Sequence, residues 1–236
     1  MRYALYFTPE AGTELATLGD TWLGRSAATG RTIEQPDFPG LPGSELASFT
    51  GPARRYGFHG TLKAPFRLAE DASEAGLLET MRSFASETPA FEIAALKVDL
   101  LEGFLALTPD GSADELNSFA NRVVEHFEPF RDELTESEIE RRNPDRLSSA
   151  ELKNLLRWGY PYVFDLFRFH MTLSSRLPGS DAPRVMSAAT RYFAPALNGP
   201  VPVRTLALFV EPEPGAPFRI HSRMPLATGQ QHRKTA

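Results

Sequence analysis

Hydrophobic residues along the chain follow two periods, one of two residues and one of nearly four. Runs rich in aromatic and β-branched residues, each ending at a turn residue, predict strands. Apolar residues at i, i+4 and i+7, often preceded by a capping residue, predict helices. The predicted strands cover 2–8, 58–66, 91–100, 102–108, 162–177, 201–211 and 217–226, and the predicted helices begin at Thr13 and cover 73–87, a stretch after Ser112, and 181–194.

Two long segments show neither period clearly. Residues 25–57 are interrupted by prolines and glycines, and they predict a long ordered loop of a kind that is often functional. Residues 131–160 are dense in charge and predict a small helical insert. They carry two capping-box patterns, Thr135 with Glu138 and Ser148 with Glu151. The insert is either a solvated pair of helices or a lid over a site.

The predicted elements repeat along the chain. Residues 58–108 and 162–226 both consist of strand, helix, strand and strand, and the first strand of each contains Phe-His-x-Thr-Leu, at 58–62 and at 169–173. A repeat of this length predicts a duplicated fold. We therefore expect one bilobed α+β domain over 1–226. Its two β-α-β-β halves would be related by a pseudo-twofold axis, with antiparallel sheets facing a central cleft and the insert outside them.

Side chains alternate across a strand, so each repeat presents a polar stripe on one face. The stripes are His59, Thr61 and Lys63 in the first repeat and Arg168, His170, Thr172 and Ser174 in the second. Two imidazoles, each with an ordinary pKa of about 6.5, suit acid–base chemistry on a phosphodiester. The threonine hydroxyls would bind non-bridging oxygens, and Lys63, Arg168 or Arg176 would stabilise the charge that develops there. The stripes lack the ligand set of a zinc or two-metal site, so we expect neither a metal nor a cofactor.

The paired His-x-Thr-Leu motifs in a duplicated β-α-β-β frame resemble the two-histidine (2H) phosphoesterase superfamily, which includes RNA 2′-5′ ligase-like proteins and cyclic phosphodiesterases. Longer stretches, RRYGFHGTLKAPFRL, LTESEIERR, RWGYPYV and LFVEPEPGAPFRI, resemble an uncharacterised branch encoded with phosphonate-degradation genes. The resemblance implies metal-independent opening of a small ribosyl or nucleoside cyclic phosphate. Two alternatives stay open: an RNA end-processing 2′,3′-cyclic phosphodiesterase or ligase, and a module that binds a phosphorylated ligand without turnover.

Aromatic and basic residues near the motifs are further candidates for substrate binding. Tyr6 would line the site if strand 2–8 lies beside the motif strands, although core packing is the favoured explanation. Tyr56 and the pair Arg54–Arg55 precede the first motif and could bind a second phosphate or a ribose. Trp158, Tyr160 and Tyr162 either stack on a base or sugar or pack the insert against the rest of the chain.

Composition and net charge limit the kinds of partner that the protein is expected to bind. Apolar residues make up 42% of the chain and charged residues 23%, which is ordinary for a globular protein. The formal net charge of −5 disfavours binding to long nucleic acid, so the expected partner is a small phosphorylated substrate. The chain has no cysteine, and it shows neither a signal peptide nor a membrane-spanning run. We expect a cytoplasmic protein without membrane association, and a flexible tail at 227–236; the sequence does not predict an oligomeric state.

Overall fold

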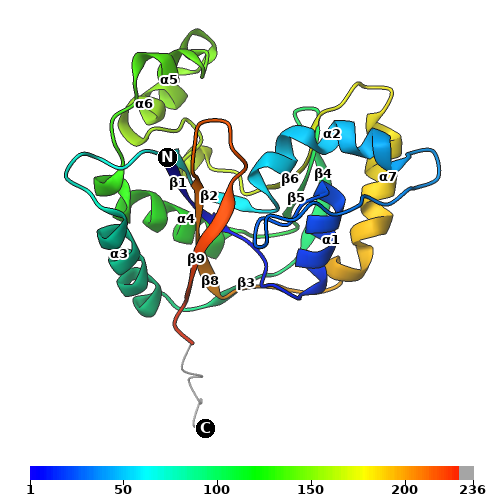
Figure 1. The fold of residues 1–236 in the computed structure, drawn as a ribbon, viewed down its shortest axis with the longest axis horizontal. Helices are drawn as coiled ribbons and strands as arrows, with labels where there is room; N and C mark the ends of the chain where they lie inside the picture. The colour runs from blue at the N-terminus through cyan, green and yellow to red at the C-terminus, as the bar shows by residue number, and fades with distance from the viewer. Residues whose placement is uncertain (229–236) are drawn as a thin grey trace.

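A computed structural model describes residues 1–228. Its centre is a seven-stranded antiparallel sheet with the order β4-β5-β6-β2-β1-β8-β9, and β3 and β7 form a separate two-stranded sheet (Figure 1). The strands are β1 (Arg2–Phe7), β2 (Gly60–Phe66), β3 (Phe91–Ile93), β4 (Leu96–Leu101), β5 (Phe104–Pro109), β6 (Met171–Arg176), β7 (Val201–Val203), β8 (Thr205–Glu211) and β9 (Arg219–Pro225).

The helices gather in three places. In Figure 1, α1, α2 and α7 lie together on the right, α3 and α4 lie on the left, with α4 beside β2, and α5 and α6 form a separate corner of the molecule. Their bounds are α1 (Glu14–Leu23), α2 (Gly43–Tyr56), α3 (Glu74–Glu87), α4 (Asp114–His126), α5 (Glu136–Glu140), α6 (Ser149–Trp158) and α7 (Ala182–Phe193). The fold is therefore mixed α/β with an antiparallel sheet, as the sequence predicts at this level.

The two halves of the chain share one sheet, so the prediction of two separate sheets is wrong. The same element order occurs in both halves, but their hairpins are exchanged. The β4–β5 hairpin of the first half pairs with β6, and the β8–β9 hairpin of the second pairs with β1. β2 and β6 then meet at the centre through the antiparallel pair Gly60–Met171. This exchange brings the two motif strands side by side.

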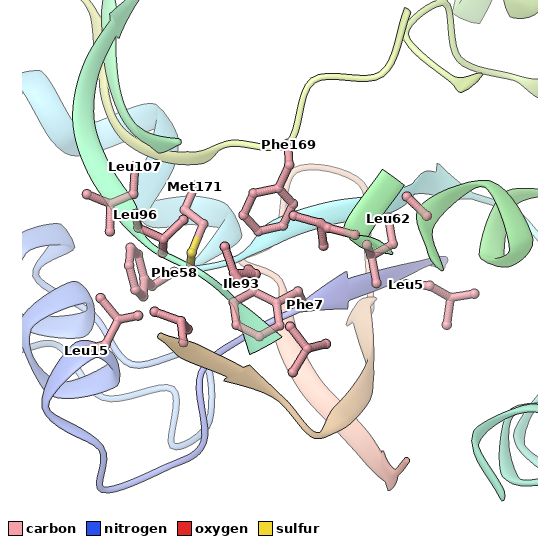
Figure 2. Close-up of a cluster of buried hydrophobic side chains, with 14 of the residues drawn as sticks. Leu5, Phe7, Leu15, Phe58, Leu62, Ile93, Leu96, Leu107, Phe169 and Met171 are labelled. Carbon is pink, nitrogen blue, oxygen red and sulfur yellow. The ribbon is translucent and has the colours of Figure 1, made fainter. Parts of the chain in front are cut away.

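The two faces of the sheet have different roles. On one face, Leu5 and Phe7 of β1 join a large core cluster with residues of α1, α3, α4 and α7. Figure 2 shows Phe58, Leu62, Phe169 and Met171 in this same cluster, so the residues that alternate with the motif histidines anchor both motifs in the core. The other face carries a smaller cluster of Ala4, Tyr6, Ala27, Ala207, Phe209 and Phe218.

Several predicted elements have other bounds. The segment 25–57 contains α2 in place of a continuous loop, because Leu46, Thr50 and Ala53 form a buried stripe that outweighs the breakers Gly51 and Pro52. The strand predicted over 162–177 begins only at Met171, where its neighbours β5 and β2 first pair with it.

Each predicted middle strand, 91–100 and 201–211, is divided into two, since its first part pairs in the small sheet and its second part in the large one.

Ser112 does not cap α4, which begins after Ala113 without a side-chain cap. Of the predicted tail, Ala227 pairs with Pro89, and residues 229–236 lie outside the described part.

The insert is helical, and both predicted capping boxes are formed. Arg67, directly after β2, ties it to the sheet through Asp132 at 2.9 Å and Glu138 at 2.5 Å. None of the helices within residues 1–228 combines the length and the apolar character needed to cross a bilayer.

Candidate active site

The two His-x-Thr motifs meet where β2 and β6 pair. Because Gly60 and Met171 are antiparallel partners, Thr61 lies toward His170 and His59 lies toward Thr172. Thr61 and His170 line one small cavity. Gly60 is required at its position, since a Cβ there would lie 2.4 Å from the ring of Phe169. The four predicted catalytic residues therefore lie together at the centre of the sheet.

His59 is enclosed by aromatic rings. Its ring stacks on Tyr6, with centroids 3.9 Å apart and an interplanar angle of 21°. Its Nδ1 lies 2.8 Å from the carbonyl of Gly57, which can only accept, so Nδ1 carries a proton and Nε2 of the neutral ring is free to accept one. Thr61 Oγ1 lies 3.3 Å from that Nε2. Burial lowers the pKa of His59 to about 4; the Gly57 carbonyl opposes this shift, and the nearby His170 adds to it.

His170 has the same backbone anchor in a more open setting. Its Nδ1 lies 2.8 Å from the carbonyl of Arg168, two residues earlier, as in His59. Its neighbour is the ring of Phe104, edge-on with centroids 5.6 Å apart. A cavity of about 520 Å³ opens beside it, lined by Leu100, Leu101, Glu102, Phe104, Glu151, Tyr160, Tyr162, Asp165, Leu166 and Arg168. One histidine thus faces aromatic rings and the other faces a large cavity.

Lys63 does not line the site, contrary to the prediction. Tyr6 pairs with Thr61 but Leu5 pairs with Lys63, so a bulge at Leu62 shifts the alternation by one residue. Lys63 is 3% exposed on the helical face, where Nζ donates to the Val124 carbonyl and lies 2.7 Å from Glu128. Burial lowers the pKa of Lys63, and Glu128 opposes that shift.

A register shift also keeps Ser174, in the second repeat, out of the candidate site. β5 and β6 shift register between Phe104 and Ala106, which leaves Ser174 in a bulge. Its side chain is 1% exposed, and Oγ accepts from Leu105 N and donates to the Ser175 carbonyl. Lys63 and Ser174, each four positions after a motif histidine, are thus buried residues that bond neighbouring elements.

Of the predicted arginines, Arg168 reaches the site and Arg176 does not line it. Arg168 is exposed and borders both cavities that His170 lines. Arg176 is paired with Phe104 near the far end of β6 and borders neither cavity. Among the predicted cations, Arg168 is therefore the one that borders the same cavities as His170.

Both predicted tyrosines lie beside His59. Tyr6 is 1% exposed, and the Tyr56 ring lies 6.2 Å from the His59 ring and stacks on Phe218. Burial raises the pKa of Tyr6, and the hydroxyls of Tyr56 and Tyr160 add to the shift. Tyr6 is thus both a packed residue and a wall of the site.

The insert also contributes to the site. Tyr160, near its end, and the adjacent Tyr162 line both His170 cavities, whereas Trp158 packs edge-on against Phe164 with centroids 5.0 Å apart. The predicted aromatic cluster therefore divides into two wall residues and one packing residue.

Sequence reasoning missed a group of charged residues on the same face of the sheet. Arg2 alternates with Ala4 and Tyr6 on β1, and it pairs with Glu211 across the β1–β8 ladder. The period of two along β1 was the signal that could have placed Arg2 on the face of Tyr6. Among residues 1–228, no three His, Asp or Glu side chains are grouped as a metal site.

Comparison with known proteins gives the family. The family described as "Protein of unknown function (DUF1045)" matches residues 61–219, which is more than half of the chain. The chain belongs to this DUF1045 family. The matched range begins at Thr61 and includes His170 and Thr172, while His59 stands two residues before it.

Two curated relatives have the name "Ribose 1,5-bisphosphate phosphokinase PhnN". The one from Janthinobacterium sp. (strain Marseille) is 42% identical over 236 residues, which cover 98% of this chain and 52% of the relative. The one from Laribacter hongkongensis (strain HLHK9) is 39% identical over 222 residues, which cover 93% of this chain and 50% of the relative. The chain thus spans about half the length of these relatives. A solved structure titled "Crystal structure of phosphoesterase" matches over 96% of this chain and 99% of its own, with 15% identity and a TM-score of 0.43.

Proposed function

We propose that this DUF1045 protein opens a small cyclic phosphate of a ribose derivative without a metal ion, with His59 as general base and His170 as general acid. The observation that carries the proposal is the matched pair of imidazoles. Each has Nδ1 held by a backbone carbonyl at 2.8 Å, and both belong to motifs that meet at Gly60 and Met171. Two such groups beside two threonine hydroxyls can transfer protons to and from a phosphodiester.

In the proposed reaction, water attacks phosphorus while His59 Nε2 accepts its proton. The bond between phosphorus and one ring oxygen of the cyclic diester breaks, and Nε2 of protonated His170 donates a proton to that oxygen. The product is a phosphomonoester beside a free hydroxyl, so atoms and charge balance. Thr61 and Thr172 donate to the non-bridging oxygens, and Arg168 lies close enough to His170 to offset their charge.

The two environments support this division of roles. His59 stays neutral at pH 7 because burial lowers its pKa to about 4, so its Nε2 is unprotonated and available to accept a proton. His170 borders the larger cavity, of about 520 Å³, where the leaving alcohol of a sugar fits between Tyr160, Tyr162 and Phe104.

The relatives' name supports a phosphorylated ribose as the substrate class, since it refers to ribose 1,5-bisphosphate. It does not support kinase activity in this chain, because the sequence contains no G-x-x-x-x-G-K-[ST] phosphate loop. We place the kinase activity in the half of the relatives that this chain does not cover. A role in phosphonate degradation, which the resemblance to the branch encoded with phosphonate-degradation genes implies, is part of the same proposal.

A substrate screen in the presence of a chelator tests the proposal. The protein is incubated with EDTA and with nucleoside 2′,3′-cyclic phosphates, ribose 1,2-cyclic phosphates and oligonucleotides that end in a 2′,3′-cyclic phosphate, and products are followed by ³¹P NMR. We expect a small cyclic phosphate to be opened at a rate that EDTA does not change. Turnover restricted to oligonucleotide ends would favour the RNA-processing alternative. Binding without turnover of any substrate would favour the binding module.

A further inference from the structure

A second cavity lies on the same face of the sheet as His59. It has a volume of about 410 Å³ and lies next to Tyr56, and its wall is rich in arginine. The lining residues are Met1, Arg2, Arg55, Tyr56, Arg67, Glu138, Arg141, Glu211, Pro214 and Gly215. Four guanidinium groups stand against two carboxylates there, so the wall carries excess positive charge in a chain whose net charge is −5.

A buried carboxylate holds two of these arginines in place. Glu211 is 1% exposed; Oε2 accepts from Arg2 Nε at 2.5 Å, and Oε1 accepts from Arg55 and from Gly215 N. Burial alone would raise the pKa of Glu211, but the hydrogen bonds from Arg2, Gly215 and Arg55 hold it below its usual value. Glu211 therefore stays ionised, and the two guanidinium groups are positioned before any ligand arrives.

The arginines retain donors for a ligand. Arg2 uses Nε for Glu211, and within residues 1–228 no acceptor is bonded to its two terminal nitrogens. Arg141 is 68% exposed and lies 4.0 Å from Glu138, a distance too long for a hydrogen bond. Arg67, in contrast, uses all three nitrogens on Asp132, Glu138 and the Glu133 carbonyl. Arg55 uses Nε for the Ala216 carbonyl and Nη2 for Glu211, and within residues 1–228 no acceptor is bonded to its Nη1. Free donors thus come from β1, from α2 and from the insert.

The cavity lies near His59, on the other side of Tyr56. The Arg55 Cζ lies 5.3 Å from the Tyr56 ring, and the Tyr56 ring lies 6.2 Å from the His59 ring. These distances place the Arg55 guanidinium within about 12 Å of the His59 ring. If one phosphate is hydrogen-bonded to Arg55 and another to His59, each over about 2.8 Å, the gap that remains between the two phosphates can be spanned by one pentose.

We propose that this arginine-lined cavity binds a second phosphate group of the substrate. The inference rests on the proposed function and narrows it. The substrate is then a sugar or nucleoside that carries two phosphate groups: the reacting cyclic phosphate, and a phosphomonoester that is separated from it by about the length of one pentose. The insert then has a defined role, because it brings Arg141 to the second phosphate and Tyr160 to the His170 side of the site.

The test compares matched substrates that differ only in the second phosphate: adenosine 2′,3′-cyclic phosphate with and without a 5′-phosphate, and ribose 1,2-cyclic phosphate with and without a 5-phosphate. We expect kcat/KM to be about 10²-fold higher for the phosphorylated member of the preferred pair, as charge-assisted hydrogen bonds would give. Arg55→Met and Arg141→Met should each reduce that preference by about 10-fold or more. Arg82→Met is the matched control, because Arg82 is exposed on α3 and pairs with exposed Glu79.

A binding measurement separates failure of the subsite from failure of the proposed function. Titration calorimetry with ribose 5-phosphate should show binding that Arg55→Met or the more exposed Arg141→Met weakens about 10-fold and Arg82→Met leaves unchanged. If no cyclic phosphate is opened but this dependence on arginine holds, the proposed function fails and the subsite stands. The proposed subsite would be overturned if kcat/KM were equal for the two members of both substrate pairs. It would also be overturned if Arg55→Met and Arg141→Met both left the preference for the second phosphate and the affinity for ribose 5-phosphate unchanged.

Discussion

His59 and His170 occupy equivalent positions in the two halves of the chain, but their surroundings differ. Both use Nδ1 to bond the carbonyl two residues earlier, at 2.8 Å. His59 stacks on Tyr6 beside Tyr56, whereas His170 has one edge-on aromatic neighbour and a cavity of about 520 Å³. The repeated sequence thus gives both histidines the same backbone anchor, and the elements packed around each copy give them different environments.

The comparison extends to the residues that follow each motif. Lys63 and Ser174 both stand four positions after the histidine, and a bulge turns each of them away from the site. Lys63 bonds the backbone of α4 and Ser174 bonds the backbone of β5. The proposed reaction therefore uses only the short segment of each repeat that precedes its bulge.

The largest effect should come from the histidines themselves. We expect His59→Asn and His170→Asn each to lower kcat for the preferred cyclic phosphate by about 10²–10⁴-fold, because each removes one proton transfer. The double variant should lose far less than the product of the two factors, since the transfers belong to one reaction. Steady-state kinetics on the three variants measures this. Near-normal turnover in both single variants would make the motif structural.

Loss of the threonine hydroxyls should have a smaller effect. Thr61→Val and Thr172→Val keep the shape of the side chain and remove a donor to a non-bridging oxygen. We expect kcat to fall by about 10–10³-fold in each, by analogy with removal of an oxyanion donor. Thr61→Ser and Thr172→Ser are the matched controls and should retain most of the activity. If the valine variants matched the serine variants, the hydroxyls would have no role in the reaction.

The partly buried setting of His59 should also appear in the pH dependence of stability. Its pKa in the folded chain is about 4, below the 6.5 of an unperturbed histidine, so the unfolded chain binds more protons between these values. The free energy of unfolding should therefore fall as the pH drops from about 6.5 to 4, by on the order of 2 kcal/mol from this residue, and level off below.

Urea denaturation of the native chain and of His59→Asn at pH 7, 5.5 and 4 measures this contribution. The loss between pH 7 and 4 should be smaller in the variant. His126→Asn, at an exposed position on α4, is the control and should behave like the native chain. Equal losses in the native chain and in His59→Asn would contradict a lowered pKa of His59 in the folded chain.

The smallest effect on turnover should come from Lys63. Because Lys63 lies on the helical face, Lys63→Met should change kcat by less than about threefold while it lowers the melting temperature, since Glu128 and the Val124 carbonyl lose a partner. Parallel kinetics and thermal denaturation measure the two effects. A large loss of kcat with an unchanged melting temperature would restore Lys63 to the site.

Local patterns predicted the elements and the motif pair well. The alternation of Phe58, His59 and Gly60 correctly separates core from site, and the capping boxes at Thr135 and Ser148 are both formed. Non-local pairing could not be predicted in the same way. The hairpin exchange that unites the two halves depends on which edges meet, and the bulges after both motifs depend on partner strands. Lys63 and Ser174 were misplaced for that reason, and Arg2 was overlooked because its partner Glu211 is distant in sequence.

The division of roles between the two histidines is tested most directly by changing the leaving group. A cyclic phosphate of an aromatic diol releases a phenolate that needs little help from a general acid, whereas a sugar cyclic phosphate releases an alkoxide. We expect His170→Asn to lower kcat/KM about 10²-fold or more on the sugar substrate but less than about 10-fold on the aromatic one. His59→Asn should lower it by a similar factor on both. The reverse pattern would exchange the two roles, and equal losses for both variants on both substrates would contradict acid–base catalysis by this pair.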